Sequence, residues 1–211
     1  MKSRFKWYSK ASADYNNQLA LTDDVLYKLC KKYPNHSKKS VVHAKLCLIG
    51  RSYHTGIERQ IKSRGGQGSA ITQLVAHLYN NRKKIDKMFN QLSSVSEPLT
   101  SDKLGIIIKV HGQFVNLLAK KLRKNRSARS FVSKYMHFHC PAVPIYDSIA
   151  SSVLRGKCRW DDGFEIFSPP KGSDEEYCYF VFRFWQLYQE LRKIDEKGNV
   201  KLLDNYLIWI S

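Results

Sequence analysis

The chain has 211 residues and a formal net charge of +18, from 36 Lys and Arg against 18 Asp and Glu. Its 43% hydrophobic and 12% aromatic content is typical of a folded protein and excludes a disordered chain. No run approaches the ~18 consecutive apolar residues of a membrane span, and no signal-peptide core follows the charged N-terminus. The positive charge favours a polyanionic partner, with nucleic acid preferred over an anionic membrane surface.

Apolar residues recur at helical spacing along most of the chain, and no segment shows convincing strand alternation. Residues 1–20 indicate an arm packed on the body, and residues 63–69 and 156–174 indicate loops. We expect an all-α fold in a single domain, residues 1–211. The expected helices cover residues 22–33, 41–50, 71–92 with a break near 80, 104–122, 129–139, 148–154, 177–194 and 200–210.

Charged and aromatic residues interrupt the apolar pattern where the second of these helices ends. Arg51, Tyr53, Glu58 and Arg59 fit either an internal salt-bridge set at a helix junction or part of a functional site. Both interpretations stay open at this point.

The sequence shows no pattern typical of a metal site or of a set of disulfides. The five cysteines are scattered without a Cys-x-x-Cys pair, which indicates neither a disulfide framework nor a zinc or iron–sulfur site. His137 and His139 do not share a helix face, which argues against a metal pair with Cys140. We expect no metal, no cofactor and a reducing, cytoplasmic location.

The most informative stretch runs from Ser127 to Leu154. A helix ends before Pro141 and Pro144, and Asp147 stands where the next helix begins, so Asp147 is a natural N-cap. Cations ahead of this stretch and at its start can hold a phosphate together with backbone N–H groups; they are Lys124, Arg126 and Arg129. A carboxylate one helix further on can stabilise the positive charge that develops at C1′ when an N-glycosidic bond breaks, or orient a water.

The segment Pro144-Ile145-Tyr146-Asp147-Ser148-Ile149 resembles the catalytic-Asp segment of helix-hairpin-helix DNA glycosylases. Lys121–His139 would supply the hairpin and its second helix. The resemblance implies two helical lobes around a cleft, with a lobe of about 70–155 carrying the hairpin. It also implies that Asp147 is the essential carboxylate. The remaining candidates are Lys124, Arg126, Arg129 and Lys134 as DNA contacts, and Arg51, Tyr53, Tyr135 and Tyr146 for the base pocket.

Two departures from the family pattern refine this expectation. The hairpin Lys124–Ala128 lacks the family's glycines, so side-chain cations are expected to replace the backbone clamp. Bifunctional members carry a lysine near the start of the second helix, where this chain has Ala128, and Lys134 is a less suitable nucleophile. The resemblance therefore implies a monofunctional glycosylase that leaves an abasic site.

The expected partner is double-stranded DNA with a modified base, bound by a monomer. Repair, or defence against phages with modified cytosines, would be the setting by analogy with the family. The main alternative is a non-catalytic nucleic-acid-binding module in which Asp147 only caps a helix. An RNA-directed enzyme or toxin is a third possibility.

Overall fold

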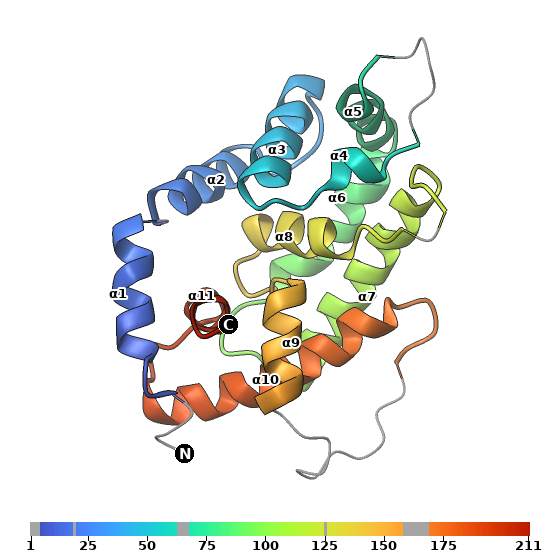
Figure 1. The fold of residues 1–211 in the computed structure, drawn as a ribbon. Coiled ribbons are helices and arrows are strands. Elements are labelled where there is room, and N and C mark those ends of the chain that lie inside the picture. Colours follow the sequence, from blue (N-terminus) through green and yellow to red (C-terminus); the bar gives the residue numbers. More distant parts are fainter. Residues whose placement is uncertain (1–4, 19, 63–67, 125, 158–168) are drawn as a thin grey trace.

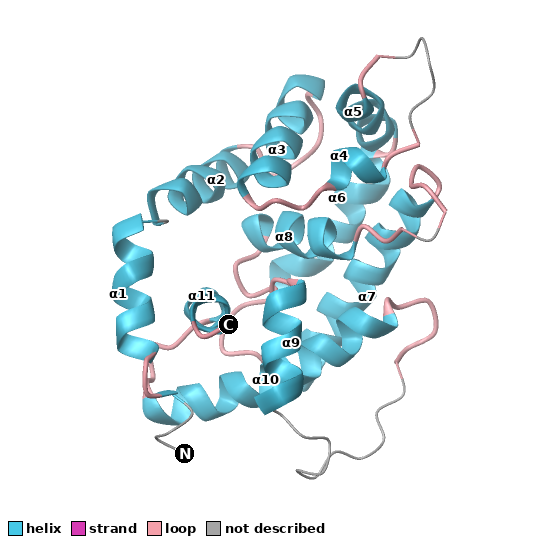
Figure 2. Cartoon of the chain, viewed as in Figure 1, coloured by secondary structure: helices cyan, strands magenta, loops and turns pink. Residues whose placement is uncertain are grey.

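The computed structural model describes residues 5–18, 20–62, 68–124, 126–157 and 169–211. Within these ranges the regular structure is helical, apart from an isolated antiparallel bridge between Ile61 and Leu122 (Figure 2). The all-α class is thus confirmed for the described residues. The elements are α1 (Tyr8–Gln18), α2 (Ala20–Lys32), α3 (Lys39–Ser52), α4 (Ile57–Gln60), α5 (Ala70–Asn80), α6 (Arg82–Asn90), the 3₁₀ helix η2 (Gln91–Ser94), α7 (Ser101–Ala119), α8 (Arg129–His139), α9 (Ser148–Lys157), α10 (Glu175–Ile194) and α11 (Val200–Trp209).

The break expected near residue 80 is found at Asn81, which separates α5 from α6, and the Asn81 Nδ2 donates to the His77 carbonyl at 2.9 Å. That bond satisfies one of the last carbonyls of α5. The N-terminal arm is helical as well, as α1, and it packs on α11. The long loop expected over 156–174 falls mostly outside the described residues.

The helices form two groups, joined by α7 and α8 (Figure 1). One group contains α2 to α6, in which α3 packs on α5. The other contains α1, α9, α10 and α11, with α11 lying between α1 and α9. The segment 70–155 is therefore not a separate lobe, because its first helix packs on α3 and its last packs on α10 and α11.

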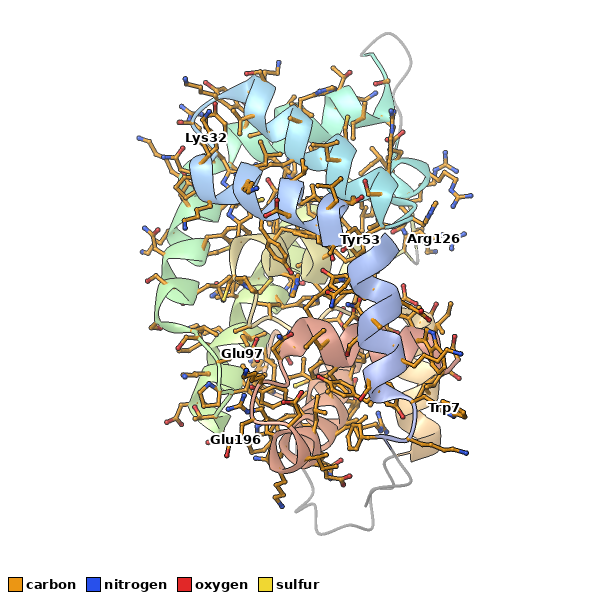
Figure 3. The ribbon with its side chains drawn as sticks, turned by 90° about the vertical axis from the view of Figure 1, so that its left-hand side faces the viewer. Trp7, Lys32, Tyr53, Glu97, Arg126 and Glu196 are labelled. Atoms are coloured by element: carbon orange, nitrogen blue, oxygen red, sulfur yellow. The ribbon has the colours of Figure 1, made fainter. Side chains whose placement is uncertain are left out.

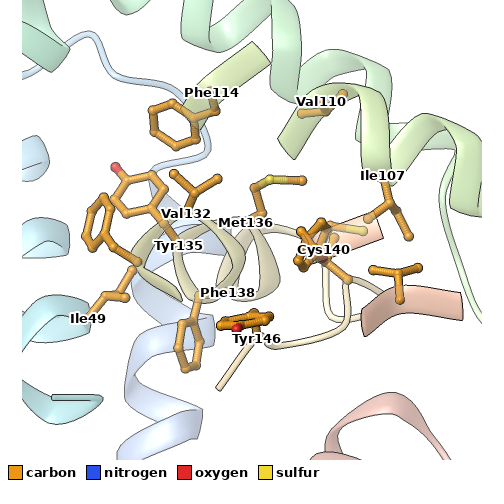
Figure 4. Packing of buried hydrophobic residues seen from close by; sticks show 14 of the residues in the cluster. Ile49, Ile107, Val110, Phe114, Val132, Tyr135, Met136, Phe138, Cys140 and Tyr146 are labelled. Atoms are coloured by element: carbon orange, nitrogen blue, oxygen red, sulfur yellow. The ribbon is translucent and has the colours of Figure 1, made fainter. Parts of the chain in front are cut away.

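Helix α8 is the centre of the hydrophobic core. Its side chains Phe131, Val132, Tyr135 and Met136 are all fully enclosed. Figure 4 shows the last three between Ile49 of α3 and Phe114 of α7. Burial of each large apolar side chain stabilises the fold by ~1.5–3 kcal/mol. Helix α8 is therefore firmly held, and so are its buried polar residues Ser133, Lys134 and His137. Among the described residues, no helix is long and apolar enough to cross a membrane.

Candidate active site

A cavity of about 520 Å³ opens between the two helix groups. Residues from α1, α2, the end of α3, α8, the start of α9 and α11 line it, so most of its walls come from segments far apart in the sequence. Three predicted site residues meet here: Asp147, Lys134 and Tyr53. The other described lining residues are Ala11, Asp14, Tyr15, Thr22, Asp23, Ser52, His54, Ile145, Ile149, Lys201, Asp204, Asn205, Ile208 and Trp209.

Asp147 caps α9 and also takes part in an ion pair. Its Oδ1 accepts a hydrogen bond from the Ile149 backbone N–H at 2.9 Å, the geometry of an N-cap. Its Oδ2 lies 3.1 Å from the Lys134 Nζ, and its side chain keeps 27% exposure. The second oxygen therefore serves an ion pair and not the helix, and both partners of that pair line the cavity.

The turn that carries Asp147 is fixed by side chains from two helices. The His137 Nδ1 donates to the Val143 carbonyl at 2.8 Å, and the Tyr177 hydroxyl donates to the Pro144 carbonyl at 2.8 Å. The Ser133 hydroxyl accepts from the Tyr146 N–H at 2.9 Å. Each bond satisfies a buried backbone group of the proline-rich turn, and together they hold the carboxylate in one position.

Lys134 lies in the wall of the cavity, not on the surface. Its side chain is only 4% exposed, and its Nζ donates to the Tyr53 carbonyl at 3.2 Å as well as to Asp147. The expected DNA contact by Lys134 does not fit this position, because an enclosed and doubly bonded ammonium does not reach a phosphate on the outside.

A second polar cluster lies next to this pair. The Tyr53 hydroxyl donates to Asp23 Oδ1, and the Tyr15 hydroxyl donates to Asp23 Oδ2 at 2.7 Å. The Lys201 Nζ lies 3.2 Å from Asp23 Oδ2 and donates to the Tyr53 hydroxyl oxygen at 3.1 Å. Burial, followed by the Asp23 carboxylate, raises the pKa of the Tyr53 hydroxyl, which therefore stays protonated as the donor. Figure 3 shows Tyr53 close to the junction of α1 and α2.

Aromatic and aliphatic side chains complete the cavity. Trp209 is held by a hydrogen bond from its Nε1 to Asp14 Oδ2 at 2.8 Å. Tyr15 and Tyr53 lie along the same cavity, and the aliphatic residues are Ile145, Ile149 and Ile208. A cavity with flat, partly apolar walls and a few polar groups suits a planar heteroaromatic ligand.

Two of the predicted base-pocket tyrosines lie elsewhere. Tyr135 is 0% exposed in the core, where its hydroxyl contacts the His36 Nε2 at 2.9 Å. The expectation that Tyr135 stacks on a base therefore requires correction, because it is enclosed on all sides. Tyr146 is not among the described lining residues; its ring packs on Phe180 and its hydroxyl donates to Glu176 at 2.9 Å.

The predicted cations take different positions. Lys124 and Arg126 are exposed in the connection between α7 and α8. Arg129 is half-buried and pairs with Asp174, with 2.5 Å between Nε and Oδ1. Its charge is thus largely neutralised within the protein, so the predicted phosphate contact by Arg129 finds no support. Arg51 is exposed and pairs with Glu58 at 3.1 Å, which favours the salt-bridge interpretation of that junction.

The residues missed by sequence reasoning are Asp23, Lys201, Asp204 and Trp209. Their one sequence signal is the helical spacing of Lys201 and Asp204, which lie one turn apart on α11. In the part of the chain that the structure describes, no group of three or more His, Cys, Asp and Glu side chains is arranged to hold a metal ion.

Comparisons with known proteins place the chain in no established family. No protein-family model matches the sequence, and neither curated proteins nor solved structures give a significant match. The geometry of the cavity is therefore the basis for the functional argument.

Proposed function

We propose that the protein is a monofunctional DNA glycosylase that hydrolyses the N-glycosidic bond of a modified base flipped out of duplex DNA. The observation that carries the proposal is Asp147: it is fixed at the start of α9 with one oxygen capping the helix and the other paired with Lys134, and both residues line a ligand-sized cavity. A cap alone requires only the first of these contacts.

In this proposal the flipped base occupies the cavity and its deoxyribose lies at Asp147. The walls offered by Trp209, Tyr15 and Tyr53 can stack on a base, at ~1–3 kcal/mol for each stacked ring. A cavity of about 520 Å³ falls in the range of small-molecule sites, ~300–1,000 Å³. The cost of unstacking the nucleotide, a few kcal/mol, selects for bases that are already weakly paired.

Asp147 then acts on the sugar. As the C1′–N bond lengthens, positive charge builds on the sugar ring, and a fixed carboxylate stabilises that charge more in the transition state than in the ground state. Lys134 holds the carboxylate in place at 3.1 Å. A water adds to C1′, and the products are the free base and an abasic site.

The absence of lyase chemistry is part of the proposal. A Schiff base requires a neutral amine with access to C1′. The Lys134 Nζ instead donates to Asp147 and to the Tyr53 carbonyl. We propose that Lys134 is a positioning residue for Asp147 and that the abasic strand leaves the enzyme intact.

The connection between α7 and α8 is proposed to contact the DNA backbone as a helix-hairpin-helix element. Backbone bonds to the end of α4 and the residues after it anchor its first part. The Lys62 N–H donates to the Lys121 carbonyl and the Arg123 N–H to the Gln60 carbonyl, both at 2.8 Å. The exposed Lys124 and Arg126 follow at once. This anchored, cationic connection replaces the glycine-rich clamp with side-chain charge.

The proposal is tested with a panel of duplex DNAs that each carry one modified base, including modified cytosines as found in phage DNA. Released base is identified by mass spectrometry, and the strand is examined with and without alkali. We expect one class of base to be released and the strand to break only after alkali. Tight DNA binding without release of any base would favour the non-catalytic binding module, and preferential binding of RNA at matched salt would favour an RNA-directed protein.

A further inference from the structure

Among the four aspartates that line the cavity, Asp204 has surroundings that differ from those of Asp147. Asp204 lies on α11, is 4% exposed and lines the cavity. Its Oδ1 is buried and has no hydrogen-bond partner in the described structure. The neighbouring Asn205 lines the same cavity, and its Nδ2 is also buried without a partner. Buried polar atoms are almost always satisfied, so these two atoms leave unused hydrogen-bonding capacity beside the cavity.

The other oxygen of Asp204 is weakly held. The Lys201 Nζ lies 3.5 Å from Asp204 Oδ2, but it is closer to Asp23 Oδ2, at 3.2 Å, and to the Tyr53 hydroxyl, at 3.1 Å. Asp147, in contrast, has a donor on each oxygen. Asp204 thus has fewer hydrogen-bond donors than Asp147, which favours a proton on Asp204.

The charged groups around Asp204 agree with this assignment. Burial raises the pKa of Asp204 and is the largest effect; Lys201 and Lys134 lower it, and Asp147 raises it. These groups come from α11, α8 and the start of α9. The other titratable groups of the cluster are Asp23 on α2, Tyr15 on α1 and Tyr53 after α3, and burial raises the pKa of both tyrosines. Pairs of carboxyl groups driven to different protonation states are a common basis for acid–base catalysis.

We propose that Asp204 is a catalytic residue that donates a proton to the departing base. This inference rests on the proposed glycosylase function. The C1′–N bond breaks and its electron pair stays with the base, while the Asp204 proton moves to a ring nitrogen or carbonyl oxygen of that base. The resulting Asp204 carboxylate is stabilised by Lys201. A water adds to C1′ and passes its proton to Asp147 and then to solvent, and Asp204 regains a proton from water. One water is consumed, and one neutral base and one abasic sugar are formed.

The protonation state is tested on the whole protein without DNA. In protein carrying ¹³C at the aspartate side-chain carboxyl, one signal should keep the chemical shift of a protonated acid at pH 7. That signal should be missing from Asp204→Asn and present in Asp147→Asn. Absence of any protonated aspartate signal in the wild-type protein would overturn the proposal, even if Asp204→Asn failed to fold.

The catalytic role is tested by single-turnover release of the base that the panel identifies. Asp204→Asn keeps the shape but has no acidic proton, so release should slow by ~10²-fold or more, with unchanged DNA affinity. The decline of the wild-type rate at high pH should vanish in this variant, and Asp204→Glu should recover part of the rate. A rate within threefold of wild type, or an unchanged pH profile, would overturn the role of Asp204 and leave the role of Asp147 intact. Failure of the wild-type protein to release any base would instead contradict the proposed function, whatever the ¹³C result.

Discussion

Asp147 and Lys134 form the pair on which the account depends at the scale of single residues. Asp147 is 27% exposed and Lys134 only 4%, so the lysine is the enclosed partner that fixes the more accessible carboxylate. An ammonium in this position orients the acid and is shielded from solvent by Tyr53, whose ring centroid lies 5.8 Å from Nζ. Lys134 should therefore affect the rate of the reaction more than the binding of DNA.

Replacing Lys134 with Met tests that division of roles. Met has similar length but no charge, so Asp147 keeps its cap and loses its ionic partner. We expect single-turnover base release to slow by ~10- to 100-fold, with DNA affinity within twofold of wild type. A quenched single-turnover assay measures the rate of base release, and fluorescence anisotropy measures the DNA affinity. A large loss of affinity with an unchanged rate would show that Lys134 contacts phosphate after all.

Buried histidines should make the fold sensitive to acid. Burial lowers the pKa of His111 to about 4 and that of His137 to about 3. In the unfolded chain both return to ~6.5, so between pH 6.5 and 4 the unfolded state binds more protons than the native state. The free energy of unfolding should therefore be at its full value above pH 6.5 and fall as the pH drops towards 4, by up to ~1.4 kcal/mol per pH unit for each histidine.

Urea denaturation at pH 7 and pH 5 measures this loss. His111→Gln should lower stability at pH 7, since His111 stacks on Tyr177 with 3.6 Å between ring centroids, and should also reduce the dependence on pH. His43→Gln is the control, because His43 is exposed and its replacement should change neither quantity. Equal pH dependence in wild type and His111→Gln would contradict the argument.

At the scale of elements, α7 contacts the segment before α10 at one closely packed glycine. A Cβ on Gly112 would lie 2.7 Å from the Gly172 carbonyl oxygen and 2.8 Å from the Ser173 Cα. Both are backbone atoms, so one of the two segments would have to move. Gly105 lies on the same helix, and a Cβ there meets nothing within 4 Å.

The two glycines predict opposite effects of the same substitution. Gly112→Ala should destabilise the protein by ~1–3 kcal/mol through overpacking. Gly105→Ala should stabilise it by ~0.5–1 kcal/mol, because alanine loses less conformational entropy in a helix. Thermal and urea unfolding of both variants measure the difference. Equal stability of the two would show that the contact between α7 and the segment before α10 is looser than the structure indicates.

The spacing of apolar residues predicted where the helices lie in the sequence better than it predicted which helices pack on one another. The boundaries of α8 follow from apolar spacing and from Pro141. The end of α10 follows from apolar spacing too, but α10 begins at Glu175, after the cap Asp174, and not at the expected residue 177. The α5–α6 division was expected near residue 80 and is found at Asn81. Helix α1 was missed because its exposed face is rich in polar residues, and its apolar contacts are made with α11, at the other end of the chain.

The sequence likewise predicted some residues of the candidate site and missed others. Asp147 and Tyr53 were found because a proline turn and an interrupted apolar pattern mark them locally. Asp23 and Lys201 were not, because their roles arise only when α2 and α11 meet at the cavity. Tyr135 was assigned to the pocket from its residue type, whereas its helix face turns to the core. Local patterns fix the type of element, and long-range packing decides which side chains share a cavity.

At the scale of the whole molecule, the charge is unevenly distributed. The chain carries +18, yet the cavity collects four aspartates against two lysines, Asp14, Asp23, Asp147, Asp204, Lys134 and Lys201. The excess of positive charge must therefore lie outside the cavity, where the proposed function requires it to attract a phosphate backbone.

The salt dependence of DNA binding tests the external charge. Each phosphate contact contributes ~0.9 to the slope of log K against log salt for duplex DNA. Lys124→Ala and Arg126→Ala should each weaken binding to all sequences alike and reduce the slope by ~1. Lys28→Ala is the control, since Lys28 is exposed on α2 and already pairs with Asp24 at 2.6 Å. Unchanged slopes in the first two variants would move the DNA contact away from the α7–α8 connection.

The most direct test of the central claim is base release by Asp147→Asn. Asparagine still caps a helix, so folding and DNA binding should survive, while the charge that stabilises the sugar is lost. Asp86→Asn is the control, because Asp86 has similar exposure, 28%, and a side-chain partner, the His36 imidazole, at 2.7 Å, but lies outside the cavity. We predict that the wild-type protein and Asp86→Asn release the modified base at similar rates, and that release by Asp147→Asn falls by at least ~10³-fold. Equal release by Asp147→Asn and wild type, or no release by the wild-type protein from any DNA of the panel, would contradict the account.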